Sequence, residues 1–495
     1  MTDRQVFLKT FAQENADERN KDTLTYRIKF IREFLNGTIL QPIYSIQEKP
    51  TYDCIEIIRQ LSGEHSLHYV KSGSTGHIFK GIFLYGYTDN DAFEYCIKVV
   101  PYFKSVEYNA INDKNRPENT EITMAHLLSQ FVITGQTPHI LLPITTFNTS
   151  INPFLSLVDD DIVNEENDQY VQFLNNYKCG LYHDQVSILI SEWCNHGNLS
   201  DYLNNNYQNM DVNEWRTYFF QIIATLALIQ DKYPGFRHNC LKANDILMQK
   251  TSKDDDIKFF TYTLFGKSYR VPNVGYNIKM NDFDFACIPG VVNSTKTELE
   301  WTKKINVTNR KNHYYDIHYF FNTLAFRGFF KGVVPNEVKE FVQRVVPEQY
   351  QFNSPSRLVN RRGRILNDDE YTTPIKLLDD PFFDVFRSEL QHNISSSATS
   401  NKRNNTDYNN DSNKKVKMDI YSNVTSKRNN TDNNNDNGHN KKAKSDELSS
   451  EELHTSISMK NNTNNYMTQM LLGGRGRLIE FFNENYDPFL FKPTG

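Results

Sequence analysis

The stretch that organises this chain is residues 236–247, Phe-Arg-His-Asn-Cys-Leu-Lys-Ala-Asn-Asp-Ile-Leu. It is a polar loop closed by a short apolar strand that begins at Ile246. The segment before the loop, residues 215–228, is strongly apolar and predicts a core helix. The loop also carries Cys240 and Asp245.

A hairpin is predicted upstream, over residues 69–81, with Gly73 and Gly76 in its turn. A turn with few side chains lets backbone N–H groups approach a phosphate group. On its own, the segment is explained equally well by a plain Ser/Gly hairpin. The next strand, residues 93–100, alternates apolar residues and brings Lys98 to its inner face. A lone lysine in a strand is usually solvated, but its place after the hairpin favours a phosphate-binding lysine.

A helix predicted over residues 121–128 offers a carboxylate partner for Lys98. Glu121 suits this role because the helix carries apolar residues at helical spacing. Glu118 is the alternative, but it lies beside Pro117 at the start of the helix. An acidic residue at that position is explained more simply by the helix macrodipole.

Four further segments follow in order along the chain. They are a buried strand with a polar end at residues 187–199, the run Asn-Asp-Phe-Asp-Phe-Ala at 281–286, the helix Tyr-Tyr-Asp-Ile-His-Tyr-Phe-Phe at 314–321, and residues 371–383, which end in Asp-Pro-Phe-Phe. Residues 148–185, before the first of them, are interpreted as a polar insertion, and residues 248–278 as an extended hairpin with a charged surface tip. The helix that begins at Ser200 is expected to be capped by its own Ser200/Asp201 pair, and the run 281–286 is expected to lie on one strand.

Taken together, residues 65–390 resemble the protein kinases, with a similar segment for nearly every functional motif. The loop at 236–247 is similar to H-R-D-L-x-x-x-N, the hairpin to the glycine-rich loop, residues 93–98 to V-A-I-K, and residues 282–284 to D-F-G. The resemblance implies an α+β, two-lobed protein-kinase-like fold, with a small β-rich lobe carrying one helix and a larger, mainly helical lobe. The position of Lys242 favours the serine/threonine branch. The hinge, the D-F-D-F-A run and the 314–321 helix look like those of the divergent kinases of large DNA viruses.

The resemblance also implies roles for individual residues. The positions that would bind ATP are Gly73, Gly76, Ile78, Lys98, Glu121, Glu192 and Cys194, the last two through the backbone of the hinge that receives adenine. The Mg²⁺ ligands would be Asp282 and Asp245, and the catalytic positions are Cys240 and Lys242. Asp316 would hold the backbone of the catalytic loop.

The chain departs from the family pattern at several of these positions. Cys240 stands where the family has its catalytic Asp, Asp245 replaces the metal-binding Asn, and Asp284 replaces the glycine of D-F-G. Asn239 removes the Arg that reads a phosphorylated activation loop, and Lys71 replaces the first glycine of the hairpin. No A-P-E motif lies between residues 282 and 316. Activation by loop phosphorylation is therefore not expected.

Composition limits the binding partners, metal sites and cellular compartment that we expect for the protein. A formal charge of −5 over 495 residues argues against an electrostatic field over the whole protein that would attract nucleic acids or membranes. The six cysteines are scattered without a C-x-x-C pair, which excludes the usual zinc spacings and predicts free thiols in a reducing compartment. No apolar signal core and no membrane-spanning run is present. We therefore expect a soluble intracellular protein, in the host cytoplasm or in a virion if the chain is viral.

The ends of the chain differ from its centre. Residues 1–62 predict an N-terminal helical extension, with amphipathic helices at 24–35 and 52–61 that pack on the next domain or bind a partner. The kinase-like domain is expected at 63–390, with its small lobe at about 63–191 and its large lobe at about 195–390. Residues 391–465 are poor in aliphatics and predict a disordered tail, followed by a short segment at 466–495.

The tail contains an internal repeat, in which Lys-Arg-Asn-Asn-Thr-Asp at 402–407 recurs at 427–432. Its basic clusters at 414–417 and 441–444 are compatible with nuclear targeting or an anionic partner. Duplicated low-complexity sequence explains them at least as well, because short basic clusters are common by chance.

Two functions of different class follow. In the first, the protein binds ATP and Mg²⁺ and transfers phosphate to protein Ser/Thr with strongly reduced activity. In the second, it is a pseudokinase that binds nucleotide and acts as a scaffold or regulatory module. Cys240 separates the two, because a thiol with a pKa of about 8.5 is a poor hydrogen-bond acceptor and mostly neutral at pH 7. The protein substrate or partner is not predicted by the sequence.

Overall fold

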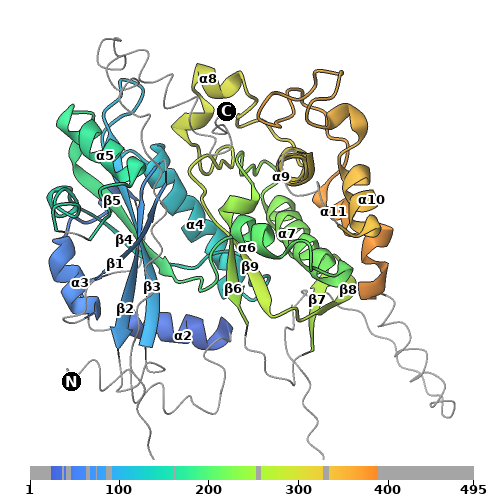
Figure 1. The fold of residues 1–495 in the computed structure, drawn as a ribbon, viewed down its shortest axis with the longest axis horizontal. Coiled ribbons are helices and arrows are strands. Elements are labelled where there is room, and N and C mark those ends of the chain that lie inside the picture. Colours follow the sequence, from blue (N-terminus) through green and yellow to red (C-terminus); the bar gives the residue numbers. More distant parts are fainter. Residues whose placement is uncertain are drawn as a thin grey trace, which may run out of the picture. The chain divides into compact units, whose positions relative to one another are not determined.

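The computed structural model describes residues 24–35, 38–40, 46–62, 67–73, 75–84, 92–160, 162–251, 258–326 and 334–387. All of them belong to the first of two compact units, residues 1–421. The second unit, residues 422–495, lies outside the described part, as does the whole of the predicted tail and C-terminal segment. Helices and strands are mixed, and the expected α+β class is confirmed (Figure 1).

A five-stranded antiparallel sheet occupies the first half of the described chain (Figure 1). Its strands lie in the order β1 (His68–Ser72), β2 (His77–Leu84), β3 (Ala92–Phe103), β5 (Tyr182–Glu192) and β4 (Pro143–Ser150). Alternate residues of β2 are buried, because successive side chains of a strand point to opposite faces. The glycine hairpin is therefore present as the β1–β2 connection.

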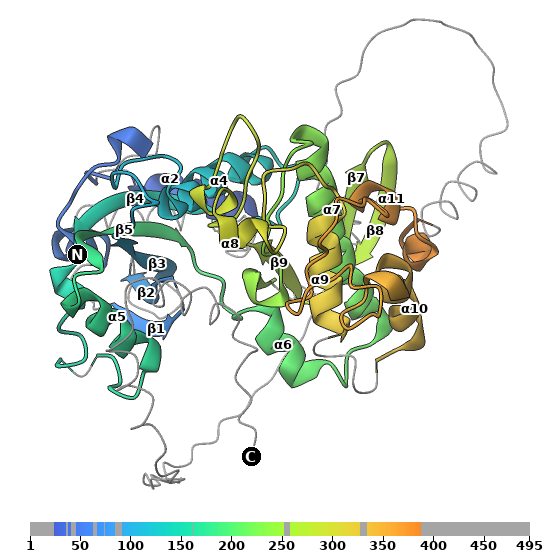
Figure 2. The same ribbon diagram turned by 90° about the horizontal axis from the view of Figure 1, so that it is seen from above.

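Three helices contribute side chains to the apolar core of this sheet. They are α2 (Leu24–Leu35), α3 (Cys54–Ser62) and α5 (Asp168–Lys178). The first two lie where the sequence predicted amphipathic helices, and both pack on the sheet core. The interpretation of 148–185 as a purely polar insertion was wrong, because α5 buries Tyr170 and Phe173 in this core and the segment also completes β4 and β5. Figure 2 shows α5 beside β1 and β2.

Helices dominate the rest of the described chain. They are α4 (Pro117–Ile133), α6 (Leu199–Asn206), α7 (Val212–Lys232), α8 (Glu300–Lys303), α9 (Tyr315–Phe326), α10 (Asn336–Val345) and α11 (Pro374–Leu377). Short 3-10 turns occur at η1 (Ile46–Glu48), η2 (Asn152–Phe154), η3 (Ala243–Asp245), η4 (Thr295–Thr297), η6 (Glu348–Tyr350) and η7 (Pro381–Phe383). Two antiparallel pairs complete the fold, β6 (Ile246–Lys250) with β9 (Tyr276–Met280) and β7 (Phe259–Leu264) with β8 (Lys267–Pro272). The hairpin expected within 248–278 is thus present, while its charged tip lies outside the described residues.

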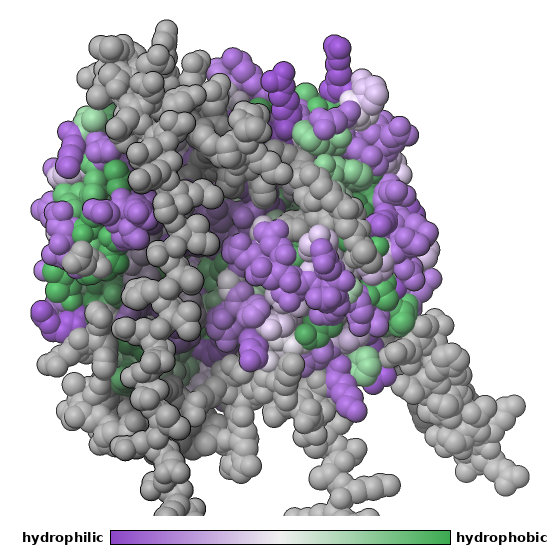
Figure 3. Space-filling view, viewed as in Figure 1, coloured by the Kyte–Doolittle hydropathy of each residue, from purple (hydrophilic) through white to green (hydrophobic). Residues whose placement is uncertain are grey.

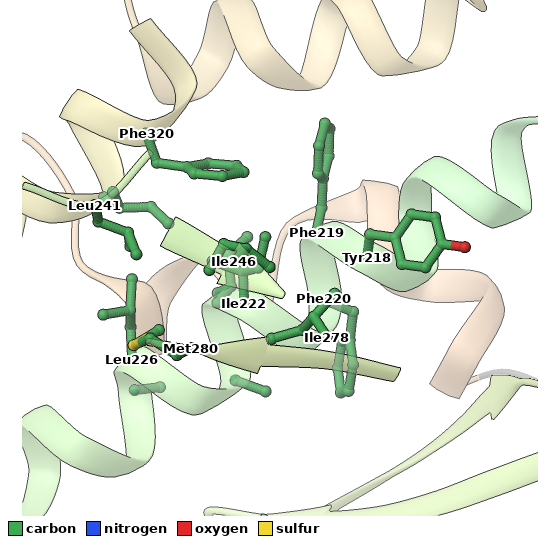
Figure 4. Close-up of a cluster of buried hydrophobic side chains, with 14 of the residues drawn as sticks. Tyr218, Phe219, Phe220, Ile222, Leu226, Leu241, Ile246, Ile278, Met280 and Phe320 are labelled. Atoms are coloured by element: carbon green, nitrogen blue, oxygen red, sulfur yellow. The ribbon is translucent and has the colours of Figure 1, made fainter. Parts of the chain in front are cut away.

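Helix α7 is the centre of a second apolar core, as its composition predicted (Figure 4). Its first turn is capped by Asp211, whose Oδ1 accepts from the backbone N of Glu214 at 2.9 Å, while Glu214 Oε2 accepts from Asp211 N at 3.1 Å. Leu241 and Ile246, which lie on either side of residues 242–245 in the catalytic-loop segment (residues 236–247), point into the same core. The loop is therefore anchored at both sides by buried apolar side chains.

Two local predictions were wrong. The cap of α6 is Asn198, whose Oδ1 accepts from Asp201 N at 2.9 Å, and not the Ser200/Asp201 pair. The run 281–286 does not lie on a strand, because β9 ends at Met280 and Asp282 has a φ of 65°. Left-handed backbone at a non-glycine residue is uncommon and often marks a functional turn.

The visible surface differs between the two halves of the described chain. In Figure 3, hydrophilic side chains dominate over the helices at the right, and hydrophobic residues are more frequent over the sheet side at the left. Among the described helices, none has the length and apolar character needed to cross a membrane.

Candidate active site

Lys98 on β3 is the centre of the candidate site, because its ammonium group contacts two carboxylates. Lys98 Nζ donates to Glu121 Oε1 at 2.6 Å and to Asp282 Oδ1 at 2.9 Å. Burial opposes the charge of Lys98, but the two carboxylates outweigh it and raise its pKa. Burial likewise opposes ionisation of Asp282, but the attraction and hydrogen bond of Lys98 lower the pKa of Asp282 to about 2. An ion pair between Lys98 and Asp282 is therefore maintained at neutral pH.

Glu121 reaches Lys98 from the second turn of α4, and Glu118 does not. Glu118 instead accepts from the buried Arg116, at 3.3 Å from Nε. Burial raises the pKa of Glu121 to about 7, against the attraction of Lys98. The contact expected between Lys98 and the helix thus involves Glu121.

The sheet places Lys98 beside the residues of the hairpin. Ile78 of β2 and Leu189 of β5 are its direct neighbours in register, so the three side chains share one face. In the turn, Gly73 N donates to Gly76 O at 2.8 Å. A Cβ on Gly76 would lie 2.5 Å from the carbonyl oxygen of Val99, so this glycine is required for close packing on β3. A Cβ on Gly73 would meet its nearest atom at 3.7 Å, in ordinary contact.

The catalytic-loop segment is held in place through its backbone. Asp316, at the start of α9, accepts from His238 N at 2.7 Å and from Asn239 N at 2.8 Å. Asn239 itself has a φ of 65°. The His238 ring packs against Phe283 with centroids 5.2 Å apart, and its Nε2 lies 3.0 Å from the carbonyl oxygen of Asn281. The contact predicted for Asp316 is present, and it couples the loop to the segment that carries Asp282.

Cys240 lies in this loop next to a cation that the sequence did not reveal. Arg364 Nη2 is 3.5 Å from Cys240 Sγ, and Arg364 Nη1 donates to the hydroxyl of Tyr319 at 2.9 Å. Both Cys240 and Arg364 are 6% exposed. Burial raises the pKa of the Cys240 thiol to about 11, although Lys242 and Arg364 oppose this shift. The thiol is therefore neutral at physiological pH.

Asp245 closes the short turn that follows Cys240. Its Oδ2 accepts from Lys242 N at 3.2 Å, and its carbonyl oxygen accepts from Asn281 N at 3.0 Å. Burial raises the pKa of Asp245 to about 7, and Asp282 adds to the shift while Lys242 opposes it. Asp245 is thus divided between its neutral and ionised forms near physiological pH. No carboxylate of the described residues is within ion-pair distance of the Lys242 side chain.

A buried ion pair occupies the position after Phe283. The carboxylate of Asp284 bonds to the ammonium group of Lys296, and the two residues are 4% and 7% exposed. Lys296 also lies 4.1 Å from the centroid of the Phe285 ring. One signal of this pair is present in the sequence, because an acidic residue in place of a glycine next to a buried Phe needs a cation. Which lysine of the following segment supplies it was not predictable.

Asn239 and Arg237 hold the segment downstream of Asp284. Asn239 Nδ2 donates to the carbonyl oxygens of Phe285 and Thr308, both at 3.1 Å. Arg237 Nη1 donates to Thr308 Oγ1 at 3.0 Å, and its guanidinium group stacks over the ring of Tyr315 at 3.6 Å. These contacts join Arg237 and Asn239 of the loop to Phe285 and Thr308.

The side chain of Glu192, in the predicted hinge, is buried and bonded to other parts of the protein. Glu192 is 1% exposed and bonds to Arg27 of α2, to Lys279 of β9 at 3.0 Å, and to the backbone N of Leu142 at 2.9 Å. Cys194 is buried, and burial raises the pKa of its thiol to about 12. Any adenine contact from these two residues would come from their backbone.

Comparison with known proteins decides the family. The chain is 40% identical over 394 residues to the "Putative serine/threonine-protein kinase" of Acanthamoeba polyphaga mimivirus, an alignment that covers 76% of this chain and 83% of that protein. This chain belongs to the serine/threonine protein kinase family. A second protein of the same virus and the same description is 28% identical over 278 residues, which cover 50% of this chain and 69% of that relative. No model of a protein family matches the chain.

Both relatives come from a large DNA virus, in agreement with the resemblance expected from the sequence. Lys98 thus contacts Glu121 and Asp282 directly. Asp282 is close enough to Asp245 to raise its pKa, and Asp245 acts in the same way on Cys240. Among the described residues, no group of three or more His, Cys, Asp or Glu side chains is arranged to hold a metal ion. Asp282 is the carboxylate of the site with the most open side chain, 34% exposed.

Proposed function

We propose that this kinase family member binds ATP with Mg²⁺ and transfers the γ-phosphate to protein Ser/Thr at a strongly reduced rate. The observation that carries the proposal is the double contact of Lys98 with Glu121 and Asp282. This arrangement leaves one buried ammonium group and one partly open, ionised carboxylate on the same side of the sheet. Such a pair suits a triphosphate and its cation.

Each residue would contribute a separate function. Lys98 would orient the α- and β-phosphates, and the turn at Gly73 leaves space for backbone N–H groups to approach them. Asp282 and Asp245 offer carboxylate oxygens, which are the ligands Mg²⁺ prefers. The ion, when bound, would neutralise charge on the transferring phosphate. Because Asp245 has a pKa of about 7, its share of metal binding would require loss of a proton.

The acceptor side of the site supports a reduced rate. A neutral Cys240 thiol cannot take the hydroxyl proton as a carboxylate would, and loss of a positioned base typically costs about 10²–10⁴-fold. The transition state of phosphoryl transfer is loose, so positioning by Lys98 and a cation would leave residual turnover.

The second candidate function is a nucleotide-binding pseudokinase, a scaffold or regulatory module for a protein partner. The buried contact between Cys240 and Arg364 favours it, because the acceptor position holds a thiol and a cation in place of a carboxylate base. The two candidates share the nucleotide site and differ only in transfer.

Transfer of radiolabelled phosphate to a generic basic protein substrate distinguishes them. The full chain should label the substrate slowly, and Lys98→Met should abolish labelling. Labelling that persists in Lys98→Met would come from a contaminating kinase and would leave no support for the enzyme. Absence of labelling together with measurable ATP binding would establish the pseudokinase.

We further propose the two-lobed arrangement and the domain limits expected from the sequence. The two separate apolar cores support this division, one under the sheet and one around α7. The small lobe would span about 63–191 and the large lobe about 195–390, with residues 1–62 as an N-terminal extension. The disorder expected for residues 391–465, and any nuclear targeting by their basic clusters, remain proposals from composition.

A further inference from the structure

A buried carboxylate at the hinge joins three parts of the chain that are far apart in sequence. Glu192, the last residue of β5, receives hydrogen bonds from the Arg27 guanidinium of α2, from Lys279 Nζ of β9 at 3.0 Å and from Leu142 N at 2.9 Å. The side chains of Glu192 and Lys279 are 1% and 2% exposed, and that of Arg27 is 12% exposed. The polar ends of this cluster are therefore almost fully withdrawn from water.

The positive charges of Arg27 and Lys279 keep the buried Glu192 carboxylate ionised. Burial of Glu192 favours its neutral form, but Arg27 and Lys279 together outweigh this effect and lower its pKa. The two cationic partners and the backbone donor together engage both oxygens of this buried carboxylate. Its position relative to all three donors is therefore fixed more tightly than that of a surface ion pair.

Apolar contacts hold α2 so that Arg27 cannot easily withdraw. Phe30 and Phe34 are buried in the sheet core, and both rings contact Phe93, at centroid distances of 4.8 and 5.0 Å. Ile28 and Ile31 of the same helix pack against the core around α7. Helix α2 thus contacts both cores, and its largely buried Arg27 reaches Glu192 at the end of β5.

The next part of the N-terminal segment contacts the helix that carries Glu121. Ile46 forms a small buried cluster with Ile122 of α4 and Leu189 of β5. Ile122 is the neighbour of Glu121 in sequence, and Leu189 is the register partner of Lys98. Arg27 therefore contacts the hinge, and Ile46 contacts neighbours of Glu121 and Lys98.

The cluster also connects the hinge to Asp282. Lys279 lies three residues before Asp282 on the strand that delivers it. Glu192 N donates to Leu142 O at 3.0 Å, so the hinge backbone itself is part of the same arrangement. We propose that Arg27 is a positioning residue of the nucleotide site, which sets, through Glu192, the hinge and the end of β9 that precedes Asp282. This inference rests on the proposed function, because it assumes that the site takes a nucleotide.

The test compares Arg27→Met with Arg32→Met in the full chain. Arg32 lies on the same helix but is exposed, so it controls for loss of a cation from α2. Binding of a fluorescent ADP analogue with Mg²⁺ should weaken about tenfold in Arg27→Met, the size of one lost charge-assisted hydrogen bond. Arg32→Met should bind as wild type does. Arg27→Lys keeps the cation and should fall between them.

Amide hydrogen exchange gives a readout that does not need a nucleotide. The amides of Leu142 and Glu192 should exchange faster in Arg27→Met than in wild type and Arg32→Met. If Arg27→Met fails to fold, Arg27→Lys is compared with wild type by the same exchange measurement. Unchanged exchange at both amides with unchanged ADP affinity would overturn the inference. If the wild type binds no nucleotide, the proposed function fails, and the exchange result alone decides whether Arg27 positions the hinge.

Discussion

The side chains of the catalytic-loop segment determine how far this kinase family member keeps the chemistry of its family. Cys240 is a buried, neutral thiol beside Arg364, and Asp245 is a buried carboxyl with a pKa of about 7. Neither is a carboxylate fully ionised at neutral pH, whereas Asp282 is ionised through its contact with Lys98. An ionised pair is therefore present at Lys98 and Asp282, whereas position 240 carries a neutral thiol.

Restoring the family residues at these two positions should raise phosphate transfer. In Cys240→Asp with Asp245→Asn, we expect turnover to rise on the order of 10²-fold, because a positioned base acts on the transfer step. The Michaelis constant for ATP should change little, since Lys98 and the hinge are untouched. The measurement is substrate turnover at saturating ATP. Cys240→Asn is the matched control, because it fills the same space without a carboxylate and should not gain activity.

The pKa of Asp245 predicts how stability depends on pH. The folded-state value of about 7 lies above the ordinary 3.8, so the native state keeps its proton while the unfolded state loses it as pH rises between these values. This residue should therefore destabilise the fold progressively from about pH 4 to 7, by at most about 4 kcal/mol at 1.36 kcal/mol per unit. Asp245→Asn should raise the denaturation midpoint at pH 8 and change it little at pH 4. An equal change at both pH values would contradict this assignment.

At the scale of elements, the sequence predicted those parts of the site that are local or repeat along a strand or helix. Lys98 on β3, Glu121 on α4 and Asp316 on α9 lie as expected because each is fixed by the periodicity of its own element. Arg364, Lys296 and Arg27 were missed because their partners lie in other elements, and tertiary packing brings them together. The cap of α6 was misassigned by two residues, which is common at helix ends.

The buried pair of Asp284 and Lys296 makes a prediction for the segment that follows β9. Lys296→Met removes the cation that bonds to the buried Asp284 carboxylate and should destabilise the protein by about 3–5 kcal/mol. Adding Asp284→Gly removes that charge and should recover most of the loss. The free energy of unfolding is measured by chemical denaturation for the wild type, both single variants and the double variant, which together form a double-mutant cycle. A double variant less stable than Lys296→Met would show that Asp284 stabilises the fold by other contacts.

At the scale of the whole molecule, the described part ends at residue 387 and the composition changes soon after. Residues 393–465 are rich in Asn, Ser, Lys and Asp, which predicts that a protease cleaves there first. Limited proteolysis followed by mass spectrometry should yield a stable fragment that ends near residue 390. Early cleavage inside residues 92–251, with residues 393–465 protected, would show that the prediction from composition is wrong.

The central claim is that Lys98, with Glu121 and Asp282, forms a working nucleotide site. Its most direct test is the melting temperature of the full chain with and without ATP and Mg²⁺, for the wild type and for Lys98→Met. At ligand near 100 times its dissociation constant, binding adds about 2.7 kcal/mol, which is readily measured. We predict a clear upward shift for the wild type that is lost or strongly reduced in Lys98→Met. No shift of the wild type with ATP, ADP or Mn²⁺ in place of Mg²⁺ would contradict the claim.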